Sequence, residues 1–349
     1  DLCEPVEIAG PGFINLRLRD DWLTDQVNQL VHDPRLGVVG TERPTTVVID
    51  YSSPNVAKPM HVGHIRSTVI GDTLARTLRF LGHKVIADNH LGDWGTQFGM
   101  IIYGYKHFVD ADQYEEDAVS ELSRLYRLVN DLIEYHQAVA GLPGHEEEIR
   151  EKEQQFLQQQ QRAAEAAEDE KKKQASQLRR LQAQLDDARG RLAQQQKTIA
   201  AVSADQALAA TAADHEGIRE AVLQETARLH EGDEENQQLW EQFLPSCRAE
   251  IEKIYKRLDI QFDVEYGESF YHSQLGQVVE DLLANGMAQL SEDAVCVFSD
   301  KYDTPMIIRK KDGAFLYATT DLATIQYRVA TWQPDALLYV VDHRQGEHF

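Results

Sequence analysis

Residues 45–89 constrain the fold more than any other part of the chain, because strand, loop, helix and strand signals follow one another directly. The β-branched run at 45–51 predicts a buried strand, and 84–89 predicts another. Between them, 62–81 has the apolar spacing of an amphipathic helix, which Gly82 ends. Strand, helix and parallel strand form a βαβ unit, so we predict an α/β fold with a Rossmann-like parallel sheet. Ligands bind beyond the carboxyl ends of such strands.

The loop between the first strand and the helix reads DYSSPNVAKPMHVGH over residues 50–64. His61 and His64 flank Gly63 at the start of the predicted helix, where unpaired N–H groups and the helix dipole favour phosphate. Gly63 lets a ligand approach the backbone because it has no Cβ, and Lys58 adds a cation nearby. An HxGH run alone also fits a proline-rich surface loop with an ordinary lysine. Its position at a strand-to-helix turn favours a nucleotide phosphate site.

The same loop resembles a known family. Its SPNVAKPMHVGH run is similar to the first signature of class I aminoacyl-tRNA synthetases, in the form found in arginyl-tRNA synthetases. Three further runs resemble blocks of that family and follow in its order: NHLGDWGTQ at 89–97, YATTD at 317–321 and YVVDHRQ at 339–345. Four blocks in order are far more specific than HxGH alone. The resemblance lapses over roughly 140–215.

This resemblance implies an arginine–tRNA ligase. Such an enzyme activates L-arginine with ATP and Mg²⁺ to arginyl-adenylate, and transfers it to the 2′-hydroxyl of the terminal adenosine of arginine tRNA. The resemblance implies that His61, Gly63 and His64 bind ATP, and that Lys58, His61 and His64 are catalytic. The family's other signature, KMSKS, does not occur in the sequence. Either it lies beyond residue 349 or the protein is inactive.

The resemblance also implies an arginine site. The matching positions are Asp50, Ser53, Asn55, His64, Tyr317, Asp321 and Gln345. A guanidinium requires planar acceptors, which Asp50 and Asp321 can supply, while Ser53 and Asn55 would hold the amino and carboxylate groups. Alternatively, Asp321 is a plain helix N-cap and Tyr317 a core aromatic of a strand. Asp93 and Trp94 are interpreted as structural, a helix cap and a packing ring.

The domain organisation predicted from these blocks has four parts. Residues 1–20, with a strand at 7–16, resemble the end of a preceding N-terminal domain. Residues 21–144 form the first half of the catalytic domain and 216–349 the second half, which stops before a KMSKS-like loop and an anticodon-binding domain. Residues 145–215 form a polar insertion between the halves. We therefore expect a fragment that is inactive or weakly active alone.

The insertion has a composition of its own. Residues 146–200 are rich in Glu, Gln, Lys, Arg and Ala and contain no proline. An a/d heptad series runs through Leu178, Leu181, Leu185, Ala188, Leu192 and Ile199, with Gln195 as its weak member. We predict a coiled-coil arm that folds back on itself, because both ends must return to one body. A single polar helix or a disordered insert is the alternative. The insertion's partner stays open.

Other elements follow from local pattern. Helices are predicted at 20–32, capped by Asp20 or Asp21, at 117–136 up to a break at Pro143-Gly144, within 216–258, and at 321–330. Strands are predicted at 261–264, 295–298, 306–309, 315–318 and 336–342, with a turn at 311–313.

Charge and composition bound the partners. The net charge of −23 argues against binding nucleic acid by overall attraction, so a tRNA must meet a local basic face or regions outside this chain. An acidic pocket suits a cationic substrate such as arginine. Three dispersed cysteines with no CxxC pair indicate reduced thiols in a cytoplasmic protein rather than a zinc site, and no residue is predicted as a metal ligand. With no membrane span or signal peptide in view, we expect a cytoplasmic monomer.

Two other function classes stay open. One is a non-catalytic, synthetase-like interaction module that uses the coiled coil. The other is a nucleotidylyltransferase or synthetase for another substrate, which neutral residues at both Asp50 and Asp321 would have favoured.

Overall fold

The computed structural model describes residues 2–58, 60–165, 170–302, 304–346 and 348–349. Residue 1 of the predicted N-terminal part and residues 166–169 of the predicted insertion lie outside them. The chain divides into two compact units. The first comprises Asp1–Pro54, Met60–Gly92 and Ile254–Phe349, and the second comprises Asn55–Pro59 and Asp93–Lys253.

The first unit contains the predicted parallel sheet. Its strands are β3 (Thr46–Asp50), β4 (Lys84–Asp88) and β8 (Ala336–Tyr339), in the order β4-β3-β8. Both pairings are parallel, so the α/β fold and the βαβ unit are confirmed. The register sets Asp50 of the central strand opposite Asp88 on one side and Tyr339 on the other. Three polar residues therefore end three neighbouring strands in one row.

Helix α2 (Val62–Phe80) connects β3 to β4 and confirms the helix predicted there. It approaches the chain after β3 at Gly71, where an added Cβ would lie only 2.1 Å from Cγ of Tyr51. Tyr51 and Gly71 are both buried. This close approach fixes the helix against the chain that leaves β3, just before the signature loop begins.

A second sheet of the first unit is antiparallel. It consists of β5 (Ala288–Ser291), β6 (Ala294–Val297) and β7 (Met306–Arg309), in that order. The helical segments α10 (Glu268–Tyr271), η1 (His272–Gln274), α11 (Leu275–Ala284) and α12 (Tyr317–Trp332) belong to the same region. They share a core with the sheet, formed by Tyr271, Leu275, Val278, Val279, Leu282, Ala288, Val295, Ile308 and Ala323. The predicted strands at 295–298 and 306–309 are confirmed, and β5 was not predicted.

The strand predicted at 315–318 is wrong, because α12 already begins at Tyr317. Only Phe315 pairs, as an isolated bridge to Arg309, after the predicted turn at 311–313. Thr319 donates its hydroxyl to the Ile308 carbonyl, which ties the first turn of α12 to β7. A four-residue apolar run fits a strand or a helix equally well, and here a tertiary contact selects the helix.

The N-terminal residues also differ from prediction. In place of one strand, β1 (Glu7–Ala9) and β2 (Phe13–Asn15) form an antiparallel hairpin. Gly10 and Gly12 between them have φ of +57° and +108°, which glycine adopts readily. Helix α1 (Asp20–His32) is confirmed, but its N-cap is Arg19, with Asp20 and Asp21 already inside the first turn. The predicted strand at 261–264 is reduced to one bridge between Val264 and Asp88.

The described part of the second unit is helical. Its helices are α3 (Thr96–Phe108), α4 (Ala111–Glu116), α5 (Ala118–Glu165), α6 (Lys171–Ser203), α7 (Gln206–Asp214), α8 (Ile218–Glu231) and most of α9 (Glu234–Leu258). Their core contains Tyr103, Val129, Leu132, Ile133, Val202, Ala212, Ile218 and Val222. Trp94 packs edge-on against Trp240, as expected of a structural ring. The cap expected from Asp93 is wrong, because Gly95 is the N-cap of α3.

The helix break predicted at Pro143-Gly144 is also wrong, since α5 continues through Pro143. Proline removes a helical hydrogen bond and normally kinks or ends a helix. Here Gln195 of α6 donates to the Ala138 carbonyl over 2.6 Å and bonds His145 Nδ1 over 2.7 Å. One side chain thus bridges the two sides of the proline, and the neighbouring helix outweighs the local signal.

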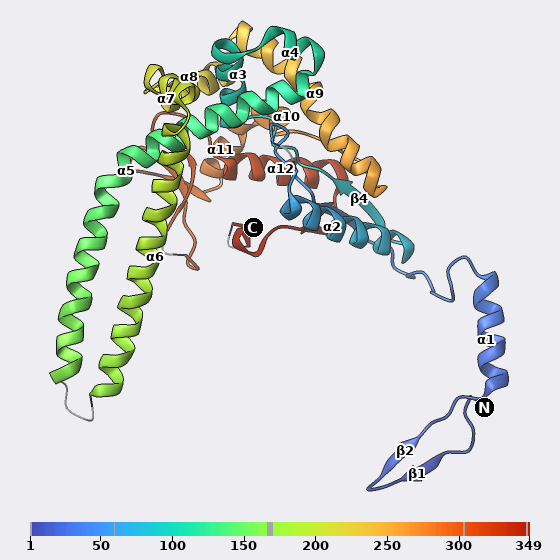
Figure 1. Ribbon diagram of the computed structural model, residues 1–349. Coiled ribbons are helices and arrows are strands. Elements are labelled where there is room, and N and C mark those ends of the chain that lie inside the picture. The colour runs from blue at the N-terminus through green and yellow to red at the C-terminus, as the bar shows by residue number, and fades with distance from the viewer. Residues whose placement is uncertain (1, 59, 166–169, 303, 347) are drawn as a thin grey trace. The chain divides into compact units, whose positions relative to one another are not determined.

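Beyond this point α5 and α6 run side by side as an antiparallel pair (Figure 1). We call residues 145–165 and 171–195 the arm. Ile149, Leu185 and Ala188 form its small core, and the predicted heptad positions are the less exposed ones along α6. Arg191 pairs with Glu148 at 2.8 Å and Arg189 with Glu153 at 2.7 Å across the two helices. The predicted fold-back is therefore confirmed and the single polar helix is excluded.

Among the described residues, no helix has both the length and the apolarity that a bilayer span requires.

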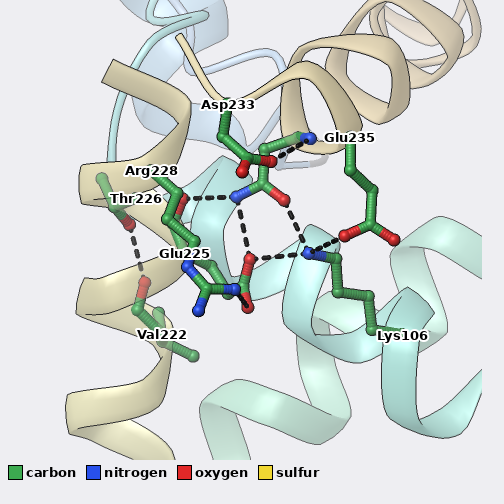
Figure 2. Close-up of polar contacts among 8 residues, drawn as sticks. Lys106, Val222, Glu225, Thr226, Arg228, Asp233 and Glu235 are labelled. Carbon is green, nitrogen blue, oxygen red and sulfur yellow. Dashed lines mark hydrogen bonds and ion pairs between the residues drawn. The ribbon is translucent and has the colours of Figure 1, made fainter. Parts of the chain in front are cut away.

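A buried polar cluster joins α3, α8 and α9 in the second unit (Figure 2). Lys106 Nζ lies 2.9 Å from Glu225 Oε2, 2.9 Å from Glu235 Oε2 and 2.7 Å from Asn236 Oδ1. Asn236 is completely buried and donates to both the carbonyl and the carboxylate of Glu225. Burial acts to lower the pKa of Lys106, but the hydrogen bonds that its ammonium donates to Glu225 and Glu235 outweigh this effect and raise the pKa. The ammonium thus links three helices as a permanent cation.

Replacing Lys106 with methionine should lower the free energy of unfolding by about 1–2 kcal/mol, because Glu225 would be left buried without its cation. The estimate is reduced because the Lys106 side chain keeps 17% of its exposure. Glu235→Gln is the matched control: that carboxylate is 70% exposed, so its loss should change stability by less than about 0.5 kcal/mol. Urea unfolding measures both. Equal effects would contradict a buried role for the Lys106–Glu225 pair.

Candidate active site

His61 and His64 form the N-terminus of α2, as predicted. His61 is the N-cap, and its Nδ1 accepts a hydrogen bond from the Gly63 amide over 3.0 Å. The His61 amide donates in turn to Nδ1 of His64 over 3.3 Å. The two rings stack with centroids 3.9 Å apart and planes 19° apart. The HxGH run is therefore a reciprocal capping box made of imidazoles, with both rings at the positive end of the helix dipole.

Gly63 is required for the conformation of His61, in addition to the ligand approach predicted from the sequence. An added Cβ would lie 2.8 Å from Cε1 and 3.0 Å from Nδ1 of His61. Glycine is thus needed here so that the His61 ring can reach the backbone amide. A ligand's approach is a second use of the same space.

The loop before α2 contains two serines in a strained conformation. Ser52 and Ser53 have φ of +74° and +45°, which residues with a side chain rarely adopt. The Ser53 amide donates to Asn89 Oδ1 over 3.1 Å, and the Ser52 hydroxyl bonds Tyr255 over 2.7 Å. Thr68 of α2 donates to the Ser52 hydroxyl over 2.7 Å. Contacts from the residue that follows β4, from α9 and from α2 thus hold the loop in one conformation.

The row of strand-end residues is closed by an arginine that the sequence analysis did not select. Arg328 of α12 is completely buried and lies 2.5 Å from Asp50 Oδ2 and 2.8 Å from Asp88 Oδ2. Its third nitrogen donates to the Tyr339 hydroxyl over 3.0 Å. The second oxygen of Asp50 accepts from the Ser53 hydroxyl over 2.7 Å. Both oxygens of Asp50 are therefore already engaged within the chain.

A second acidic position is differently placed. Asp321 lies one turn into α12, whose N-cap is Leu316, so the N-cap interpretation of Asp321 is excluded. Its Oδ2 lies 2.6 Å from Nε2 of His348, and its side chain is 23% exposed. Tyr317 stands one turn earlier and is 66% exposed, with its ring 4.8 Å from that of His348. Gln345, also exposed, accepts the His348 amide at its carbonyl over 3.0 Å. Tyr317, Asp321 and Gln345 are thus brought together around His348.

The remaining predicted residues belong to the second unit. Asn55 accepts the Ala57 amide over 3.1 Å at its own side chain, and its carbonyl accepts the Lys58 amide over 3.1 Å. Lys58 Nζ lies 5.6 Å from the centre of the Tyr126 ring, in cation–π contact. Both side chains are half-buried.

Comparison with known proteins identifies the family. The profile of the family described as "tRNA synthetases class I (R), catalytic domain" matches residues 26–192 and 164–349. The chain belongs to this arginyl class I synthetase family. It is 52% identical over its whole length to an arginine–tRNA ligase of Rhodopirellula baltica, of which it covers 53%. It is 34% identical to the one of Fusobacterium nucleatum, of which it covers 48%.

Solved structures agree with the family. The crystal structure of the arginyl-tRNA synthetase of Plasmodium falciparum is similar over the whole chain, with a TM-score of 0.59 and 25% identity. The chain covers 48% of that structure. It spans about half the length of the relatives it matches, so this synthetase chain corresponds to a part of each of them.

Three residues of this synthetase site were not found from sequence: Asp88, Arg328 and His348. Arg328 had a weak signal, because Thr320, Thr324 and Arg328 follow one another at intervals of four on the buried face of a helix. A polar stripe on a buried helix face needs partners from the sheet. His348 lies in sequence beyond the YVVDHRQ block, where no residue pattern marked it.

The buried row of the synthetase domain has shifted pKa values. Burial raises the pKa of Asp88 to about 6, and the nearby Asp50 carboxylate adds to this, against the opposing effect of Arg328. Asp88 Oδ1 has no hydrogen-bond partner among the described residues, which adds to the desolvation. Burial also raises the pKa of the Tyr339 phenol to about 12. Burial acts to lower the pKa of Arg328, but the two carboxylates raise it above its ordinary value.

The Asp88 shift predicts a pH dependence of stability. Its pKa in the folded protein, about 6, lies above the ordinary 3.8, so the folded state holds a proton that the unfolded chain has released. Stability from this group should therefore fall as pH rises from about 4 to 6, by about 1–3 kcal/mol, and stay constant above. Asn cannot titrate, so urea unfolding of wild type and Asp88→Asn from pH 4.5 to 7.5 isolates the effect. A difference between them that does not vary with pH would contradict it.

Proposed function

We propose that this chain is the catalytic domain of an arginine–tRNA ligase. It would form arginyl-adenylate from L-arginine and ATP and pass the arginyl group to the terminal 2′-hydroxyl of arginine tRNA. Three things support this: the family, the imidazole cap at the start of α2, and Asp321 beside Tyr317. The Asp321 carboxylate carries the proposal, because it is the acidic group whose geometry suits an external guanidinium.

The arginine site is proposed around α12. Asp321 Oδ1 has no hydrogen-bond partner in the described part of the chain, while Oδ2 is held by His348. One fixed and one available carboxylate oxygen can orient a planar guanidinium. Tyr317 and Gln345 line the same place, and Ser53, Asn55 and His64 remain the proposed contacts for the substrate's amino and carboxylate groups.

Asp50 receives a different role within this proposal. Since Arg328 and Ser53 occupy both of its oxygens, we assign it to positioning. It fixes the hydroxyl of Ser53 and the guanidinium of Arg328, and through them the ends of β3, β4 and β8. The substrate's guanidinium is then left to Asp321.

The phosphate site is proposed at the N-terminus of α2. The first intrahelical bond runs from the Ile65 amide to the His61 carbonyl, so the amides before Ile65 are not used in the helical ladder, and that of Gly63 donates to the His61 ring. Both imidazoles lie at this positive end of the helix dipole, which favours phosphate. His61, Gly63 and His64 would bind the ATP phosphates, with Lys58 adding charge. No group of three or more potential metal ligands occurs among the described residues. We propose that Mg²⁺ binds with the ATP, through phosphate oxygens and water.

The proposal includes a cytoplasmic monomer and the domain limits predicted above, with 145–215 as an insertion. The non-catalytic alternative is less favoured. A protein that only binds a partner through the arm would not require the strained conformation of Ser52 and Ser53, which hydrogen bonds to Tyr255 and Asn89 hold in place. Such strain persists where surrounding contacts enforce it, commonly at functional sites.

Replacing Asp321 with asparagine should weaken arginine binding by at least tenfold, since a charged, partly buried acceptor is lost. Calorimetric titration of L-arginine measures this in a full-length protein that includes the chain. Asp293→Asn is the matched control: this exposed residue between β5 and β6 has φ of +65°, which asparagine also adopts. The melting temperature of both variants should stay within a few degrees. Unaltered arginine affinity in Asp321→Asn would refute the site.

A further inference from the structure

The two ends of the arm differ in how their basic residues are paired. Near the helical body, Arg189 and Arg191 bond Glu153 and Glu148 across the two helices. Toward the end where α5 stops and α6 begins, Lys172, Lys173, Arg179 and Arg180 are exposed. Within the described part of the chain, none of these four forms an ion pair or a side-chain hydrogen bond. The positive charge of the outer arm is therefore not used to hold the arm together.

The four cations occupy one face. Positions 174, 178, 181 and 185 of α6 are turned toward α5 and are the less exposed ones. Lys172 and Arg179 lie seven residues apart on one flank of the opposite face, and Lys173 and Arg180 on the other. Seven residues span about 10 Å of helix. Two rows of two cations thus border a solvent-facing strip with Ser176 and Ala183 between them.

This distribution departs from an ordinary solvated helix, in which charges of both signs alternate. Residues 171–185 contain five basic residues and no acidic one, in a chain with a net charge of −23. Acidic residues flank this stretch on both sides in sequence: Glu170 precedes it, and Asp186 and Asp187 follow it. Asp186 accepts from Gln182 and Asp187 pairs with Arg191, so neither is paired with the four cations. A single-sign face in an acidic chain attracts a polyanion.

The chemistry of the face favours nucleic acid over a membrane. An amphipathic helix that binds a membrane surface needs large apolar anchors beside its cations. Here the strip between the cations carries alanine and serine, and the apolar residues are used against α5. Paired lysines and arginines at this spacing suit the phosphates of an RNA backbone, which positions a protein without reading sequence.

We propose that the outer face of α6, formed by Lys172, Lys173, Arg179 and Arg180, binds the sugar–phosphate backbone of RNA. This inference rests on the proposed function, which supplies tRNA as the RNA. The arm then provides the local basic face that a chain of −23 needs in order to hold a polyanion.

The test replaces the four residues together with glutamine, which keeps helix propensity and removes the charge. The control replaces four exposed lysines outside the arm, Lys256, Lys301, Lys310 and Lys311, with glutamine, for the same change in net charge. Circular dichroism checks that both variants keep their helix content. The dissociation constant for a transcribed arginine tRNA is measured by fluorescence titration from 50 to 300 mM KCl, beside calorimetry of L-arginine.

The arm variant should bind tRNA at least tenfold more weakly, and the slope of log K against log salt should shrink by about 3, as expected for four lost phosphate contacts. Arginine affinity should not change. Equal weakening in the control would show a net-charge effect and overturn the proposal, as would an unchanged tRNA affinity or no binding by wild type. The same titration is run with anionic vesicles. If the arm variant binds tRNA like wild type but no longer binds these vesicles, the proposal is overturned and the face binds lipid instead. Absent arginine binding with tRNA results as expected would refute the proposed function alone.

Discussion

Replacing Arg328 with methionine should lower the free energy of unfolding by about 3–5 kcal/mol. The guanidinium is completely buried and pairs at once with Asp50 and Asp88, at 2.5 and 2.8 Å. Its removal leaves two buried carboxylates facing each other across the ends of β3 and β4. One buried charge without its partner is already strongly destabilising, and here the two charges also repel.

Chemical denaturation of wild type and Arg328→Met measures this loss. Arg344→Met is the matched control, because Arg344 also pairs with an aspartate but is 80% exposed, so its loss should leave the unfolding midpoint close to that of wild type. The triple variant Arg328→Met, Asp50→Asn, Asp88→Asn should recover part of the loss, since no buried charge remains. A loss below 1 kcal/mol in Arg328→Met would contradict the buried-charge account.

The parallel sheet was predictable because its signal is local. The β-branched run before Asp50 and the apolar run before Tyr339 each read as buried strands, and a helix between strands implies a parallel crossover. The register, which aligns Asp50, Asp88 and Tyr339, is a tertiary fact that no single segment contains. The strand patterns alone therefore could not predict that Arg328 bonds to all three of these residues.

Local rules failed where a distant side chain decides the outcome. Pro143 carries a strong helix-breaking signal, yet Gln195, fifty-two residues later, supports the continuing helix. At Tyr317 an apolar run fits either element, and a hydroxyl contact to β7 selects helix. Both errors arise because propensity is a weak prior that tertiary contacts override.

The sequence predicted which residues of the candidate site lie together better than it predicted what each of them contacts. Asp321, Tyr317 and Gln345 do lie together, and His61 and His64 do share a helix N-terminus. Asp50 was expected to face a substrate, but the structure engages it with Arg328. Sequence spacing gives which side chains share an end of the sheet. It cannot tell whether both oxygens of a carboxylate are already bonded to side chains of the same chain.

Replacing His64 with alanine should lower the rate of arginyl-adenylate formation by about 10²-fold, on the scale of one lost electrostatic donor in a transition state. Its ring stacks on His61 at 3.9 Å at the start of α2, where the proposed phosphates gather negative charge. Pyrophosphate exchange in a full-length protein that includes the chain measures the rate. His32→Ala, an exposed histidine of α1, is the control and should leave the rate unchanged.

A glutamine variant separates chemistry from helix capping. His64 Nδ1 also accepts the His61 amide, so His64→Ala removes a cap as well as an imidazole. Glutamine at this third helical position preserves a capping box, because its side-chain oxygen accepts the same amide. If the imidazole acts on the phosphates, His64→Gln should melt like wild type and still exchange pyrophosphate about 10²-fold more slowly. Recovery of exchange in His64→Gln would mean that His64 only orders the helix, and the phosphate site would then have to rest on His61 and the backbone amides.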